Sequence, residues 1–252
     1  MKQQVMWTLA ALAIAIPGIS GAEDAADAAK EVLTKAAAVK GLTADLEIKT
    51  HDPKEKDMAV KSALTVQRGK GWKLESGPPD EHTVVNDLKV QYDYYPKEKK
   101  VAKLTADIPE IAESFRKPMD ELNPLQVLDS KSLKLVGTET FENEQVYHFE
   151  GTTTTQFMPK GAPVAQKMEA WIAKSDGLPR KTIEHVEEGT LTTIYHNVKV
   201  NPDIAADTFA FTVPAGVEVM DVNEQMKSGG PGEGKPSQKQ PAKASGAKKK
   251  AK

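Results

Sequence analysis

The strongest constraint on this chain is an alternation of apolar and polar residues with period two. Every second residue from Leu42 to Ile48 is apolar, and the alternation resumes from Val60 to Val66. This pattern predicts strands that have one apolar and one hydrated face. Frequent turn residues between such strands indicate an antiparallel meander. The turns are predicted at Ser76-Gly77-Pro78-Pro79, Asn86-Asp87, Tyr95-Pro96-Lys97, Glu142-Asn143, Asp176-Gly177 and Glu188-Gly189.

Two stretches have helical periodicity instead. Apolar residues from Ala25 to Val39 recur at spacings of four and three, and Lys40 and Gly41 then form a helix stop signal. The segment 107–117 begins like a capped helix, and a second short helical piece is predicted over 121–128. A sheet must cover its apolar face, and a helical stripe can do so. We therefore predict an α+β, mainly antiparallel fold, a single curled sheet of about ten strands with an N-terminal helix and a mid-chain helical insertion.

The two ends differ from this body. Lys2, an apolar run over 5–16 and the small residues Ser20-Gly21-Ala22 predict a secretory signal peptide, residues 1–22, cleaved after Ala22. An uncleaved membrane anchor is the alternative, but twelve apolar positions are short for a span. Residues 227–252 contain eight lysines and one acid, so we expect a disordered Lys-rich tail. The tail either binds anionic envelope surfaces or only keeps the protein in solution, and the domain itself is predicted over 23–226.

The composition excludes several kinds of chemistry. The chain has no cysteine, so disulfides, thiolate metal sites and cysteine nucleophiles are excluded. Nucleophile-elbow, phosphate-loop and HExxH motifs are absent, and we predict no enzyme, no cofactor and no metal site. We expect no nucleic acid as partner because the protein is predicted to be exported. An enzyme with His148 or His196 as base is the least favoured alternative, since nothing supplies its nucleophile.

Strand parity places two polar residues of interest, His196 and Arg68, on apolar faces. His196 shares parity with Ile194 and Val198, which predicts an inward ring, most simply a hydrogen-bonded core histidine. Arg68 continues the parity of Val66. It is either a rim arginine with a hydrated head or a latch whose donors bind carbonyls of the helical insertion.

Three segments resemble the LolA-like periplasmic carriers of outer-membrane lipoproteins. They are Val66-Gln67-Arg68-Gly69-Lys70-Gly71-Trp72-Lys73-Leu74, the stretch from Val85-Asn86-Asp87-Leu88-Lys89 to Tyr94-Tyr95-Pro96, and the stretch from Asn197-Val198-Lys199-Val200-Asn201-Pro202 through 207–217. The likeness covers most of residues 24–222 and includes Leu122-Asn123-Pro124-Leu125, where the family has lid helices. Gly69 stands where the family usually has proline.

The resemblance implies an unclosed antiparallel barrel with helices as a lid over a hydrophobic cavity. It places Arg68 where the family has the arginine that ties lid to barrel. The side chains that we assign to the cavity or lipid site are Leu46, Ile48, Leu64, Val66, Trp72, Leu74, Tyr92, Tyr94, Ile108, Ile111, Phe115 and Leu122.

The function expected from this resemblance is that of a periplasmic carrier, a monomer of one domain, that binds acyl chains of lipoproteins or other lipids. An inner-membrane donor and an outer-membrane acceptor would be its partners. The alternative is an envelope sensor or scaffold domain of the same fold that binds a protein partner without carrying lipid.

Overall fold

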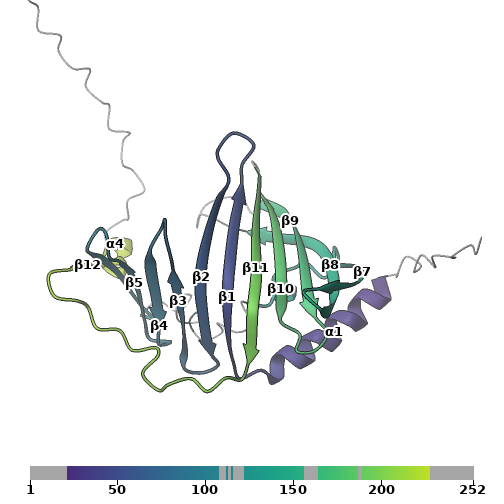
Figure 1. Ribbon diagram of the computed structural model, residues 1–252, viewed down its shortest axis with the longest axis horizontal. Coiled ribbons are helices and arrows are strands. Elements are labelled where there is room, and N and C mark those ends of the chain that lie inside the picture. The colour runs from purple at the N-terminus through teal and green to yellow at the C-terminus, as the bar shows by residue number, and fades with distance from the viewer. Residues whose placement is uncertain are drawn as a thin grey trace, which may run out of the picture.

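The computed structural model describes residues 22–107, 112, 115, 122–155, 164–186 and 189–227. Almost all of the predicted signal peptide, of the predicted lid helix and of the Lys-rich tail lies outside these residues, and those predictions stay untested. Within the described residues, the chain forms the α-helices α1 and α4 and a twelve-stranded sheet that is not closed (Figure 1). The unclosed, mainly antiparallel sheet confirms the predicted fold class, with twelve strands where about ten were expected.

The strands lie in the order β12-β6-β5-β4-β3-β2-β1-β11-β10-β9-β8-β7, so β12 and β7 are the edges. Only β12 pairs in parallel, with β6, among the described strands. The elements are α1 (Ala22–Ala38), β1 (Gly41–His51), β2 (Met58–Gln67), β3 (Gly71–Ser76), β4 (His82–Asn86), β5 (Val90–Tyr95), β6 (Lys100–Thr105), the 3-10 helix η1 (Pro124–Gln126), β7 (Lys134–Phe141), β8 (Glu144–Thr155), β9 (Val164–Ala173), β10 (Pro179–Val186), β11 (Gly189–Val200), β12 (Glu218–Asp221) and α4 (Val222–Lys227).

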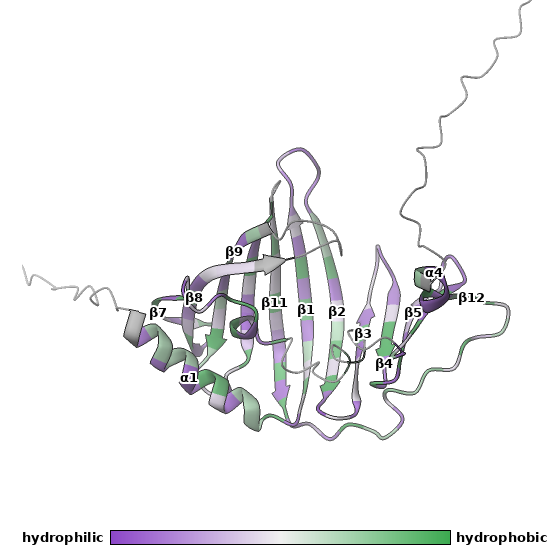
Figure 2. Cartoon of the chain, turned by 180° about the vertical axis from the view of Figure 1, so that it is seen from behind, coloured by the Kyte–Doolittle hydropathy of each residue, from purple (hydrophilic) through white to green (hydrophobic). Residues whose placement is uncertain are grey.

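The sheet is curled, and α1 lies on one side of it (Figure 2). Leu125 of η1 packs in the same core cluster as Val32 of α1, so η1 lies on that side too. We call this side the inner face and the opposite side the outer face. Residues paired across antiparallel strands point to the same face. Leu42 pairs with Val66, and Val66 pairs with Trp72, so all three belong to the inner face.

Helix α1 covers the inner face of the β8–β10 part of the sheet. Its residues Ala28 and Val32 are buried against Phe149 and Ile172, which are themselves fully buried. The turn between β9 and β10 lets the helix approach closely. A Cβ at Gly177, whose φ is +75°, would lie 1.9 Å from the carbonyl oxygen of Val32. Only glycine fits this contact, so Gly177 fixes the position of α1.

The outer face of β3–β6 has a different cover, the extended segment 201–217 that joins β11 to β12. Phe211 of this segment contacts Tyr92 and Tyr94, with ring centroids 5.1 and 5.9 Å apart. Phe209 is buried, and its ring would meet a Cβ at Gly71. The apolar layer of the molecule therefore changes sides along the sheet, from the inner face at β8–β10 to the outer face at β3–β6.

Candidate functional site

The inner face of β1, β2 and β3 carries an apolar surface that continues the cover of α1. Leu46, Leu64 and Val66 are buried there, and further apolar side chains are only half-buried against them. We call this group the inner cluster. Its members on the sheet and lid side are Leu42, Ala44, Leu46, Ile48, Leu64, Val66, Trp72, Leu74, Leu122, Tyr195 and Val198.

Seven of the twelve predicted cavity residues meet in this cluster, and they come from four separate parts of the chain. Period-two alternation was sufficient to find the four that lie on β1 and β2, because the strands are regular there, and the segment that resembles the family added Trp72 and Leu74 on β3. Leu122 joins them from the segment that follows the predicted lid helix. The seven residues are Leu46, Ile48, Leu64, Val66, Trp72, Leu74 and Leu122.

Tyr92 and Tyr94 are placed differently from the prediction. Tyr92 pairs with Val85, and Val85 pairs with Lys73, which alternates with the inner residues Trp72 and Leu74. The two tyrosines therefore lie on the outer face, where they pack under Phe211. The cause is the strand register. Asn86 of β4 and Gln91 of β5 occupy the inner positions, so the tyrosines that alternate with Gln91 point to the outer face.

The predicted lid is described only in part. Ile108 and Ile111 lie outside the described residues, whereas Ala112 and Phe115 are helical and Phe115 is only 4% exposed. After the lid, the buried Asn123 caps η1 by accepting a hydrogen bond from the backbone N–H of Leu125. Its Nδ2 donates to the carbonyl of Gly177. The predicted short helical piece is therefore present as η1, and it is tied to the same turn that positions α1.

Arg68 lies just beyond the end of β2, beside the C-terminal end of α1. Its Nε donates a hydrogen bond to the carbonyl oxygen of Val39 at 3.3 Å, and its backbone N–H donates to the carbonyl of Lys40 at 2.8 Å. The residue is exposed. The described contact therefore joins the end of β2 to the end of α1, and a contact with residues 108–121 stays a prediction.

The inner face also carries polar side chains that the sequence analysis missed. Ser62 and Thr182 are buried, and Glu184 lies on the same face of β10 as Thr182. Tyr195 faces the same side from β11, and burial raises the pKa of its hydroxyl to about 12. Alternation could have located Ser62, which has the parity of Val60 and Leu64, but the sequence analysis singled out only Arg68 and His196 as polar residues on apolar faces. The inner face is therefore apolar at β1–β3 and partly polar at β10 and β11.

Two grooves open onto this side of the molecule. One, of about 360 Å³, lies at the end of the sheet where the β1–β2 and β10–β11 turns meet, and Met58, Val186 and Leu191 line it. The other, of about 410 Å³, lies between α1 and the segment that follows η1, with Leu33 and Leu128 in its wall. Both fall within the usual volume range of small-ligand sites, about 300–1,000 Å³.

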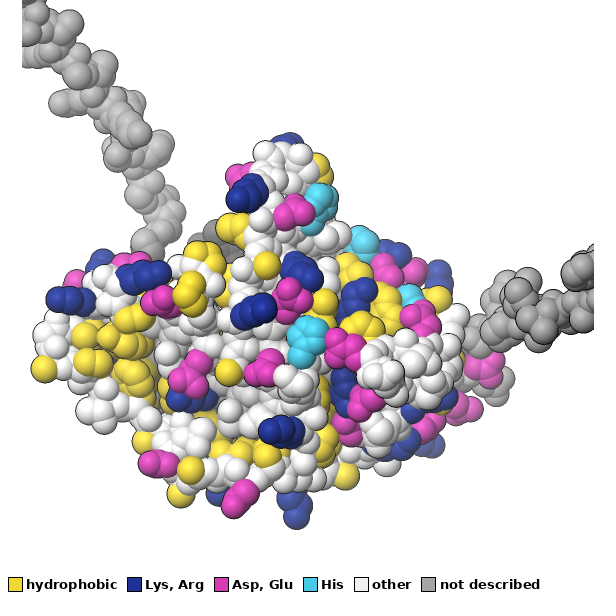
Figure 3. All heavy atoms as spheres, viewed as in Figure 1, with side chains coloured by type: hydrophobic (Ala, Val, Ile, Leu, Met, Phe, Trp, Pro, Cys, Tyr) yellow, Lys and Arg dark blue, Asp and Glu magenta, His cyan; other side chains and the backbone are white. Residues whose placement is uncertain are grey.

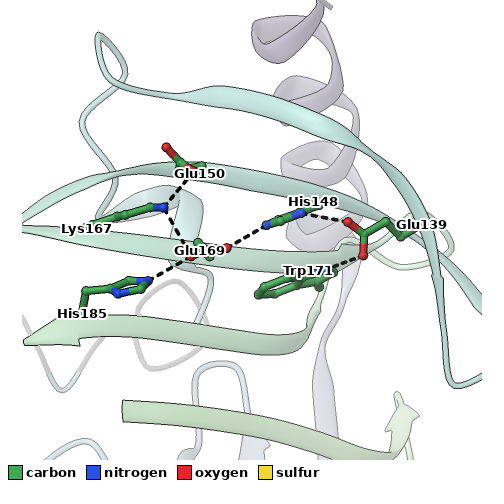
Figure 4. A network of polar contacts seen from close by, with 7 residues as sticks. All are labelled: Glu139, His148, Glu150, Lys167, Glu169, Trp171 and His185. Carbon is green, nitrogen blue, oxygen red and sulfur yellow. Dashed lines mark hydrogen bonds and ion pairs between the residues drawn. The ribbon is translucent and has the colours of Figure 1, made fainter. Parts of the chain in front are cut away.

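The outer face at β8–β10 holds a network of charged and aromatic side chains (Figure 4). His148 stacks on Trp171 with centroids 4.1 Å apart, and its ring nitrogens lie 2.9 Å from Glu139 and 3.2 Å from Glu169. His185 also contacts Glu169, at 2.9 Å. Burial works to raise the pKa of Glu169, but hydrogen bonds from His185, Lys167 and His148 bring it below its ordinary value. Both nitrogens of His148 face carboxylates, which suits a structural role better than that of a base.

His196 is on the outer face, where Figure 3 shows charged and histidine side chains over the central strands. Its ring lies 2.9 Å from Glu142 and 3.7 Å from Glu47. The prediction of an inward ring was wrong because the strand is irregular. Asn197 has a φ of +51°, and the β1–β11 register shifts beside it, so His196 and Val198 point to opposite faces.

Two other kinds of feature, a membrane-spanning helix and a metal-binding group of side chains, are not found among the described residues. In the described part of the chain, no helix is long and apolar enough to cross a membrane. Nor do the described histidine and acidic side chains form a group of three or more that could hold a metal ion.

No family model matches this chain, and neither does any curated protein sequence. Solved structures do match. An uncharacterized conserved protein from Thermus thermophilus aligns with 79% of this chain and 99% of its own, at a TM-score of 0.52 and 12% identity. A LolA superfamily protein, NE2245 from Nitrosomonas europaea, covers 73% and 97% at a TM-score of 0.39 and 12% identity.

The complex of MucA and MucB from Pseudomonas aeruginosa also matches, over 75% of this chain and 61% of that one, at a TM-score of 0.45 and 14% identity. Identities this low show a shared fold and say nothing about a shared ligand. The fold that the resemblance implied, an unclosed curled sheet with helices on one face, is present in the described residues, and the Thermus thermophilus structure shares the fold of this chain.

Proposed function

We propose that this protein is a non-enzymatic carrier that binds acyl chains on the inner face of its sheet. The observation that carries the proposal is the inner cluster. Ile48, Leu74 and Tyr195 point to the inner side without being fully buried, beside the buried Leu46 and Leu64. Half-buried apolar side chains that share one face of a curled sheet can take hydrocarbon from water.

The energetics of such transfer set the requirements for loading. Burying hydrocarbon gains about 0.8 kcal/mol per CH₂ relative to water but little relative to a bilayer. Loading from a membrane therefore needs a donor or a strained lid, and release needs an acceptor. Arg68, which binds Val39 at the end of α1, would hold the closed state and release it when a chain enters. Ile108, Ile111 and Phe115 would form the lid's inner side.

The cell envelope is the proposed location. A cleaved signal peptide over residues 1–22 would export the chain, and lipoprotein acyl chains are the favoured cargo because of the LolA-like motifs around Arg68 and 197–217. The lysines of residues 227–252 would strengthen contact with anionic surfaces by about 1 kcal/mol each near such a surface. An inner-membrane donor and an outer-membrane acceptor complete this scheme.

Fluorescent fatty-acid binding tests the proposal, together with mass spectrometry of lipid that co-purifies with the protein. Leu64→Gln should weaken probe binding at least about tenfold, because the amide places a polar group among the apolar contacts. Ala63→Gln is the matched control, since Ala63 is the exposed neighbour on the outer face. Ile48→Gln, at a half-buried position, repeats the test should Leu64→Gln fail to fold. Equal probe binding by all these proteins would refute the acyl site.

A second candidate is a scaffold domain that binds a protein partner without lipid. The favouring observation is that α1 already fills the inner face at β8–β10, where Val32 and Phe149 have no exposed surface. If the lid filled the remaining hollow in the same way, no space for cargo would be left. Absence of any probe binding, with a partner captured from the envelope by an outer-face surface, would favour this candidate.

A further inference from the structure

An acidic residue of β10, Glu184, lies on the inner face of the sheet, away from the charged networks of the outer face. Glu184 of β10 pairs with Leu191 of β11 and with Met168 of β9. Leu191 alternates with Thr193 and Tyr195, and Tyr195 pairs with the inner-cluster residue Leu46. The register therefore puts the Glu184 side chain on the inner face, in the row of residues next to the inner cluster.

The surroundings of Glu184 contain no cation in the described part of the chain. Its neighbours on the same face are neutral, whereas the charged residues of these strands, such as Lys181 and His185, point outward. Within the described residues, the side chain of Glu184 makes no hydrogen bond and no ion pair. On the neighbouring strand, the outward Glu169 has three partners: His148, Lys167 and His185. The contrast shows that the inner carboxylate is the unpaired one.

Burial affects the titration of this residue. Burial raises the pKa of Glu184, and no partner counters it. The charge of Glu184 also contributes, after burial, to the raised pKa of Tyr195, so the two side chains are near each other. Since Tyr195 packs on the inner cluster, Glu184 lies at the polar end of an apolar surface. A carboxyl that is half-buried and unpaired is costly for folding, and such groups are concentrated at functional sites.

The groove of about 360 Å³ lies at the same end of the inner face. Leu191, the partner of Glu184, and Val186 line it, and Asp52 and Glu55 stand at its wall with a single lysine, Lys56. A ligand that enters there would pass an acidic rim before it reaches Glu184 and then the inner cluster.

We propose that Glu184 is the headgroup-binding residue of the acyl site and that the preferred ligand carries a primary ammonium group beside its acyl chain. This inference rests on the proposed carrier function. An ammonium group would donate charge-assisted hydrogen bonds to the carboxylate and neutralise it in a poorly hydrated place. An alcohol would leave the charge unpaired, and a fatty acid would add a second negative charge. The inner cluster would hold the hydrocarbon.

Competition against a bound fluorescent fatty acid tests this specificity. The competitors are hexadecylamine, hexadecanol and hexadecanoic acid, used below their aggregation concentrations at pH 7.5. The full mature chain should bind the amine at least about tenfold more tightly than the alcohol, the effect of one charge-assisted hydrogen bond. Glu184→Gln should remove this preference and bind the acid more tightly than the unmodified protein does. Glu75→Gln, which changes an outer-face carboxylate on β3, should leave the order unchanged.

A second arm identifies the source of the ammonium group. Extraction of phosphatidylethanolamine over phosphatidylglycerol from mixed vesicles would identify a lipid headgroup. Binding of an acylated peptide with a free N-terminal amine over its acetylated form would identify a lipoprotein N-terminus. Either result supports the inference, provided that Glu184→Gln abolishes it.

The outcomes separate this inference from the carrier proposal. If the fluorescent probe does not bind at all, so that no displacement can be measured, the acyl site itself is refuted. If all three competitors bind but the amine has no advantage, or Glu184→Gln keeps that advantage, the acyl site stands and the role of Glu184 is overturned.

Discussion

The two ends of the sheet, β8–β10 and β3–β6, have their covered apolar side chains on opposite faces. At β8–β10 the apolar layer is on the inner face, and helix α1 covers it with Val32 packed near Phe149. At β3–β6 the apolar layer that is covered is on the outer face, under Phe209 and Phe211 of segment 201–217. Between these two parts of the sheet, the apolar side chains on the inner face of β1–β3 are not completely covered by the described residues. The candidate site therefore lies on the inner face between the two covers, where apolar side chains such as Ile48 and Leu74 are only half-buried.

The helix cover depends on a backbone contact and should be the most sensitive part of the molecule. Gly177→Ala places a Cβ 1.9 Å from the Val32 carbonyl in a residue with φ +75°, so α1 must shift. We expect a loss of about 4 kcal/mol in the free energy of unfolding, measured by denaturant titration. Gly216→Ala is the matched control, since its φ is +77° but nothing lies within 4 Å. It should cost about 1 kcal/mol, and equal losses would show that α1 is not held by this contact.

The outer cover should affect stability without affecting the ligand. Phe209→Ala removes a buried ring from segment 201–217 and should cost about 3 kcal/mol. Binding of a fluorescent fatty acid by the folded fraction should not change, because Phe209 is on the face opposite the inner cluster. Leu64→Ala, at a similarly buried inner position, should lower both stability and probe affinity. A loss of probe affinity in Phe209→Ala would break the division between the two faces.

Arg68 lies between the part of the inner face that α1 covers and the part that is not covered. Its substitution should mainly change the rate at which a bound probe is released. Arg68→Leu removes the hydrogen bond to Val39 and should cost about 1 kcal/mol of stability. Release of the bound probe should become faster, as measured by stopped-flow displacement, because α1 and β2 are no longer joined at this point. Lys70→Leu, in the same turn, is the control for loss of a positive charge. The latch would be disproved if the two variants released the probe at the same rate.

The two faces should also respond to pH with opposite sign. The pKa of Glu184 is raised above its ordinary value of 4.5, so between that value and the raised one the folded chain holds more protons than the unfolded chain. Stability from this group therefore falls as pH rises through the window. Glu184→Gln should be more stable than the unmodified protein at pH 7.5, by about 1 kcal/mol or 2–4 °C in Tm. The advantage should vanish at pH 4.

Glu169 is the outer-face comparison. Its pKa is lowered, so its stabilisation is present above 4.5 and is lost as pH falls through the lower, folded-state value. Glu169→Gln should therefore destabilise the protein at pH 7.5, and the difference should shrink in acid. Thermal unfolding of both variants from pH 4 to pH 8 checks the pair. The same sign for both substitutions would contradict the assigned difference between the faces.

Much of the fold was predictable because its causes are local. The stripe from Ala25 to Val39 forms α1, and the alternation from Leu42 to Ile48 forms β1 with the expected face inward. The fold class follows from such signals, since closely spaced turns leave few topologies other than a meander. The site was predictable only where alternation is unbroken, as in Leu64 and Leu74.

The failures have an equally physical cause. Asn197 interrupts the alternation of β11 and turns His196 outward, and a single positive φ leaves no clear mark in the sequence. Tyr92 and Tyr94 were assigned to the cavity with the other residues that the resemblance suggested. They are in a packed layer, but the segment that covers them comes from more than 100 residues later in the chain.

The sequence by itself determined which residues share a face where a strand is regular, as in β1 and β2, where the chain turns, and where helix α1 ends. These depend on backbone geometry over a few residues. Only the tertiary structure decided which face is inner, which distant segment covers it, and that Glu184 stands there without a partner. Those properties arise from contacts between segments far apart in the chain, and a period-two pattern fits either face equally well.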